Sequence, residues 1–88
     1  MKVYCVMACD FGTGETNLKD VFRTKDKAMD LAKFCANERI KGYSQTRRIV
    51  ELDDRYVVEY HEEGDIEKDT FSTDTVAVYY VVEKLVIN

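Results

Sequence analysis

The chain has 88 residues, with 17 acidic and 13 basic side chains and a formal net charge of −4. This length predicts one domain over residues 1–88, with room for a single hydrophobic core. The excess of acids argues against direct binding of duplex nucleic acid, because such binding needs a basic surface that neutralises phosphates.

The start of the chain predicts neither membrane insertion nor secretion. The apolar run over residues 3–9 is too short to span a bilayer and lacks the pattern of a signal peptide. An odd set of cysteines, Cys5, Cys9 and Cys35, predicts buried free thiols in a reducing compartment. With His61 as the one histidine, a zinc site is not expected. We therefore expect a cytoplasmic protein without a membrane, metal or other cofactor.

The first half of the chain predicts a β-hairpin followed by a helix. Residues 3–9 are apolar on both faces, which is typical of a central strand, and residues 18–23 follow after a turn-rich connection as its hairpin partner. Thr24 is a suitable N-cap for a helix that runs to about residue 40, with Gly42 as its stop. The apolar stripe of this helix consists of Ala28, Leu31, Ala32, Cys35 and Ala36, with Phe34 beside it. We expect this stripe to cover the strand face that carries Cys5 and Cys9.

The second half of the chain is of β type. Residues 46–52 and 55–61 predict a hairpin, residues 66–71 a weak strand, and residues 76–87 a long central strand beside the first one. Together these elements predict the α+β class, with a single helix packed on one mainly antiparallel sheet in the order ββα and then a β meander.

Two short stretches resemble the opening of many short, uncharacterised proteins from phages and bacteria. Residues 2–6 read KVYCV and residues 21–28 read VFRTKDKA, which gives the pattern KVYxV…VFxTxxKA. The resemblance covers the N-terminal half and implies a strand, a hairpin return, a capped helix and a phage origin, with action in the cytoplasm of the host. It carries no catalytic residue.

Acidic residues are concentrated in the second half of the chain. Residues 51–74 carry ten acids against Arg55 and Lys68 alone. Such a segment can be a solvated hairpin surface, or it can bind a basic protein or nucleoprotein surface by imitating phosphates. The candidate partner-binding residues at the hairpins are Asp53, Asp54, Glu62, Glu63, Asp65, Glu67 and Asp69.

A basic patch upstream offers a second candidate site, formed by Lys41, Tyr43, Arg47 and Arg48. Arginine forks suit phosphates and a tyrosine ring can stack on a base, so the patch predicts a module that binds a small ligand or nucleotide. The same residues can equally be an ordinary helix end and edge strand.

Signals for catalysis are weak. Gly12-Thr13-Gly14 joins two predicted strands, whereas phosphate loops usually lead from a strand into a helix. Nothing in the sequence places a nucleophile and an orienting acid beside His61. The expected function is therefore that of a non-enzymatic interaction protein, such as an inhibitor of a host defence or nucleic-acid-processing complex. The small core and the apolar long strands favour a homodimer.

Overall fold

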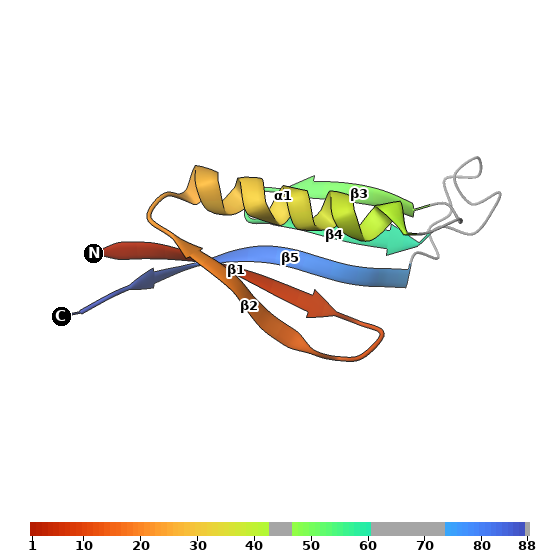
Figure 1. Ribbon diagram of the computed structural model, residues 1–88, viewed down its shortest axis with the longest axis horizontal. Coiled ribbons are helices and arrows are strands. Elements are labelled where there is room, and N and C mark those ends of the chain that lie inside the picture. Colours follow the sequence, from red (N-terminus) through yellow and green to blue (C-terminus); the bar gives the residue numbers. More distant parts are fainter. Residues whose placement is uncertain (43–46, 61–73, 88) are drawn as a thin grey trace.

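The computed structural model describes residues 1–42, 47–60 and 74–87, without the side chains of Arg47, Tyr60 and Asp74. These residues form one helix and five strands in the order ββαβββ (Figure 1). The strands are β1 (Lys2–Asp10), β2 (Thr16–Phe22), β3 (Arg47–Leu52), β4 (Arg55–Tyr60) and β5 (Asp74–Leu85), and the helix is α1 (Lys25–Lys41). The α+β class predicted from the sequence is confirmed. The weak strand predicted over residues 66–71 lies outside the described residues.

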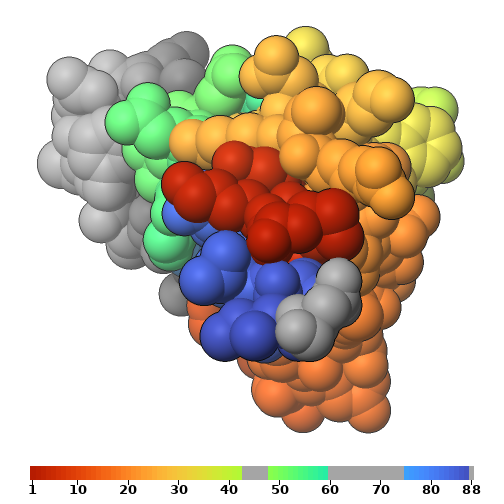
Figure 2. Space-filling view, turned by 90° about the vertical axis from the view of Figure 1, so that its left-hand side faces the viewer, coloured from red at the N-terminus to blue at the C-terminus, as the bar shows by residue number. Residues whose placement is uncertain are grey.

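The strands form one antiparallel sheet in the order β2-β1-β5-β4-β3. The two strands predicted to be central are therefore both internal, and they pair with each other from Lys2–Leu85 to Asp10–Ala77. Beyond the last pair, the Val86 amide donates to the Met1 carbonyl at 2.8 Å. The two ends of the described chain thus lie side by side, as Figure 2 shows in red and blue.

Helix α1 begins and ends where its sequence signals predict. The hydroxyl of Thr24 accepts a hydrogen bond from the Lys27 amide at 3.4 Å, which is an N-cap contact. Gly42 follows the last helical residue and donates its amide to the Ile40 carbonyl. It does so with φ −81°, in the right-handed region rather than the left-handed one that glycine C-caps commonly use.

Three alanines form the contact between the helix and the sheet. Ala28, Ala32 and Ala36 are each 0% exposed, and their small side chains let the helix backbone approach the strands closely. Leu31 and Cys35 flank this stripe and are partly buried. The sheet side of the core consists of Val6, Tyr56, Val58, Ala77, Tyr79 and Val81. Each of these lies on the face of β1, β4 or β5 that α1 covers.

Cys5 and Cys9 lie on the other face of β1, and the expectation that the helix stripe covers them is wrong. Val6 belongs to the core beneath α1, and neighbouring residues of a strand point to opposite faces. Cys5 pairs with Val82 and Val21 on the uncovered side. All three thiols, including Cys35 on the helix, are free.

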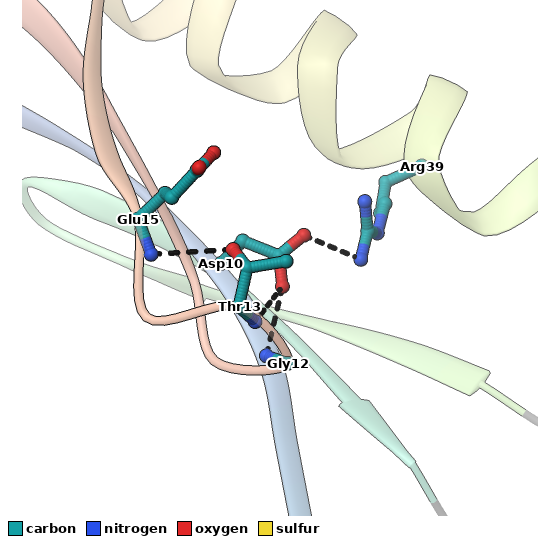
Figure 3. A network of polar contacts seen from close by, with 5 residues as sticks. All are labelled: Asp10, Gly12, Thr13, Glu15 and Arg39. Atoms are coloured by element: carbon teal, nitrogen blue, oxygen red, sulfur yellow. Dashed lines mark hydrogen bonds and ion pairs between the residues drawn. The ribbon is translucent and has the colours of Figure 1, made fainter.

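The connection between β1 and β2 is a tight hairpin turn organised by Asp10 (Figure 3). The Oδ1 atom of Asp10 accepts hydrogen bonds from the amides of Gly12 at 2.8 Å and Thr13 at 3.3 Å. Gly14 has φ +77°, a conformation that glycine adopts without steric cost. The other carboxylate oxygen, Oδ2, pairs with Nη2 of Arg39 on α1 at 2.8 Å. The Gly12-Thr13-Gly14 segment is therefore a hairpin turn, and its amides at Gly12 and Thr13 are used to bind the Asp10 carboxylate.

The Asp10 network predicts a measurable loss of stability in acid. Hydrogen bonds from the Gly12 and Thr13 amides and the nearby Arg39 guanidinium hold the pKa of Asp10 below its ordinary value of 3.8. A lowered pKa in the folded state stabilises the protein above the ordinary pKa, and this contribution disappears as the pH falls through the folded value. Asp10→Asn should therefore lower the melting temperature at neutral pH, with a gap to the native chain that narrows in strong acid. Melting curves of both chains across this range test it, and a gap that stays constant would contradict it.

Candidate functional site

An open groove of about 1000 Å³ lies between the first turns of α1 and the β3–β4 turn. Figure 2 shows the start of α1, in light orange, next to this turn, in green. The groove is lined by Lys25, Asp26, Met29, Glu51, Leu52, Asp53, Asp54, Arg55 and Tyr56. It contains both of the predicted partner-binding residues that the structure describes, Asp53 and Asp54.

Carboxylates outnumber cations at the groove, and two of them are already engaged. Asp54 accepts from Nε of Arg55 at 2.8 Å and from Nη2 at 3.1 Å. These bonds hold the pKa of Asp54 below its ordinary value. Glu51 accepts a hydrogen bond from the Tyr56 hydroxyl at 3.1 Å. These hydrogen bonds hold both carboxylates in place at the rim, and the Arg55 guanidinium is used within the fold.

Asp26 and Asp53 are the exposed acids that remain for an incoming group. Neither side chain makes a hydrogen bond or ion pair with any other residue in the described part of the chain. Asp26 lies in the first turn of α1, where a negative charge also stabilises the helix dipole. Asp53 has no such role in helix stability, so its exposed carboxylate is the stronger indication of a binding site.

The floor of the groove is apolar. Tyr56 is buried, and this burial together with Glu51 raises the pKa of its hydroxyl, which therefore remains a proton donor. Met29 also lines the groove and is partly buried. Carboxylates above an apolar floor fit the long side chains of lysine and arginine, which combine an alkyl stem with a charged head.

The sequence identified only part of this site. Five of its predicted members, Glu62, Glu63, Asp65, Glu67 and Asp69, lie outside the described residues. Asp26 and Glu51 were not predicted as members, because no local pattern reveals that the start of the helix lies beside the β3–β4 turn. The one local signal for Asp26 is its position in the first helical turn, and the helix dipole alone is enough to explain an acid there.

Of the basic patch predicted from the sequence, the structure describes the side chains of Lys41 and Arg48, and each is paired with an acid. Nζ of Lys41 pairs with Glu38 Oε1 at 2.7 Å at the end of α1. Nε of Arg48 pairs with Glu59 Oε2 at 3.0 Å, on the sheet face away from the helix. Tyr43 and the side chain of Arg47 lie outside the described parts of the chain.

A nearby arginine is also used within the fold. Arg39 extends from α1 to Asp10 (Figure 3), and both residues line a smaller cavity of about 160 Å³. Asp10 and Arg39, which face this cavity from the end of β1 and from α1, thus pair with each other.

Residues 1–42, 47–60 and 74–87 contain no cluster of three His, Cys, Asp or Glu residues that could hold a metal ion. Burial raises the pKa of the Cys35 thiol, which lowers its thiolate fraction and its reactivity. None of the helical segments in those ranges is long and apolar enough to cross a membrane.

Comparisons with protein families, with curated proteins and with solved structures gave no match to this chain.

Proposed function

We propose that this chain is a non-enzymatic interaction protein that binds a basic protein or nucleoprotein surface at the groove between α1 and the β3–β4 turn. The observation that supports this proposal is the placement of Asp26 and Asp53, exposed and without partners among the described residues, above the apolar floor at Tyr56. The floor accepts the alkyl part of a lysine or arginine side chain, and the carboxylates bind its charged end.

The binding energy comes from several contacts acting together. A single exposed ion pair contributes only about 0–1 kcal/mol, so one basic side chain does not suffice. A basic surface of a partner brings several cations to the groove at once, and its attraction to the acidic chain raises the association rate at low salt. Binding is therefore expected to weaken steeply as salt is added.

The partner that best suits this surface is a protein with a basic groove for nucleic acid. Carboxylates at a turn can take the positions of phosphates in such a groove. The resemblance of residues 2–6 and 21–28 to phage proteins agrees with a role as an inhibitor of a host defence or nucleic-acid-processing complex, acting in the host cytoplasm.

A titration with charged peptides tests the proposed function. A fluorescent oligo-arginine peptide should bind the protein at low ionic strength, and its affinity should fall about tenfold or more on going to physiological salt, where the Debye length shortens to about 8 Å. An oligo-glutamate peptide of equal length is the matched control and should not bind. Equal binding of the two peptides, or binding that does not respond to salt, would contradict the proposal.

The nucleotide-binding alternative has less support from the geometry. Lys41 and Arg48 lie on different layers of the fold, and each is paired with an acid. A thermal-shift screen with nucleotides separates the two functions. A nucleotide at 100 times its dissociation constant would add about 2.7 kcal/mol of stability if this chain binds it. If the chain instead binds a basic partner, nucleotides should leave its melting temperature unchanged.

A further inference from the structure

The sheet face opposite α1 is apolar across its middle. The strand registers place Cys9, Val78, Val57 and Val50 in one row that crosses β1, β5, β4 and β3. All four side chains are only partly buried, although three of their strands are internal to the sheet. Their exposure arises because the helix covers the other face alone.

The adjacent row adds apolar side chains at both edges of the sheet, with Arg55 as the one charged residue among them. Leu18 on β2 lies beside Met7 on β1, and Met7 lies beside Tyr80 on β5. Beyond Tyr80 come Arg55 and then Leu52 on the opposite edge strand. Leu18 is 56% exposed and Leu52 is 49% exposed. In Figure 1, α1 is the one element of the described chain that lies off the sheet, so no described element covers these rows.

The size of the face matches a protein interface. Five strands about 4.8 Å apart and six residues, the length of β3 and β4, at about 3.3 Å each span roughly 24 by 20 Å, or on the order of 500 Å² in projection. The accessible area is larger because the side chains stand out from the sheet. A stable interface buries about 800 Å² on each partner, and a monomer seldom exposes an apolar patch above about 600 Å².

The charges on this face favour a second copy of the chain over a charged partner. The acid that the described strands present here is Glu59, and it is paired with Arg48. Arg55 is likewise engaged by Asp54. Two copies of a chain with net charge −4 can therefore approach through this face without opposing unpaired carboxylates.

We infer that this face packs against the same face of a second copy, related by a two-fold axis, to form a two-sheet sandwich. Sheets in such an arrangement lie about 10 Å apart with interdigitated side chains, and the same patch serves both copies. The helices remain on the outside of the dimer, and the acidic grooves lie at its rim, where Leu52 and Arg55 border both the groove and the packed face. The inference thus goes beyond the proposed binding function and does not depend on it.

Sedimentation equilibrium over a range of protein concentrations tests the dimer. The native chain should have twice the mass of one chain at micromolar concentration. Met7→Lys places a charge on the internal strand β1 within the face and should weaken dimerisation about 100-fold, which corresponds to about 2.8 kcal/mol. Leu18→Lys changes an exposed side chain on the edge strand, where folding is not at risk, and should weaken it about tenfold.

The matched control is Phe34→Lys, which replaces a side chain that is 59% exposed on the helix and should leave the dimer intact. A native chain that remains monomeric at high micromolar concentration would overturn the inference. The face would then be covered by another protein or by another part of the same chain. A dimer that Leu18→Lys and Phe34→Lys leave equally intact would overturn it as well.

Discussion

Replacing Ala32 by leucine is expected to lower the free energy of unfolding by about 2–3 kcal/mol, because added atoms in a well-packed core force side chains and backbone apart. Ala32 is the middle of the three alanines through which α1 contacts the sheet, and it is fully buried. Beneath the helix lie Val6 and Val58, which are also fully buried and leave no space for the added atoms. The melting temperature should fall by about 10 °C or more, since a domain of this size loses about 4–8 °C per kcal/mol.

The neighbouring position provides a matched control. Lys33 is exposed on the outer side of α1, and Lys33→Leu introduces the same side chain into the same helical turn. Because leucine and lysine have similar helix propensities, this change should alter stability by no more than about 0.5 kcal/mol. Thermal and urea denaturation of the two variants at equal protein concentration measure the difference. Equal losses would show that the alanine stripe is not in close contact with the sheet.

The sequence predicted the layout of the fold because its strongest patterns are local. Residues 3–9 and 76–87 are apolar on both strand faces, which predicts that these strands are internal to the sheet. Thr24 and Gly42 predict the two ends of the helix. The sequence does not predict which face of the sheet packs against the helix, because both faces of β1 and β5 are apolar. A one-residue change of register exchanges the two faces, and no residue of these strands distinguishes them. The error over Cys5 and Cys9 has this origin.

The candidate site was predictable only where it coincides with a turn. Asp53 and Asp54 stand between two strand patterns, so their exposure at a hairpin tip follows from the sequence. Asp26 is distant along the chain and reaches the same groove only because the strand order brings β4 next to β5 and beneath the helix. Such proximity depends on long-range pairing, which short patterns do not specify.

Reversing the charges of Asp53 and Asp54 together is expected to weaken binding of an oligo-arginine peptide by more than about tenfold at low salt. The double variant Asp53→Lys/Asp54→Lys replaces two anions at the groove by cations and also frees Arg55 from its ion pair. Both positions are in an exposed turn, where loss of an ion pair changes stability by only about 0–1 kcal/mol. The variant should therefore remain folded, which its melting curve checks, while its peptide affinity is lost.

The control separates a specific site from the effect of net charge. Glu15→Lys/Asp20→Lys makes the same change in net charge at exposed positions of the β1–β2 hairpin, which does not line the groove. If the groove is the binding site, this control should retain most of the native affinity, because its new charges lie away from Asp26 and Asp53. Equal loss in the two double variants would mean that the peptide responds to the overall charge of the chain. In that case the groove would have no specific role, and the proposed binding site would be wrong even if the dimer through the opposite sheet face were observed.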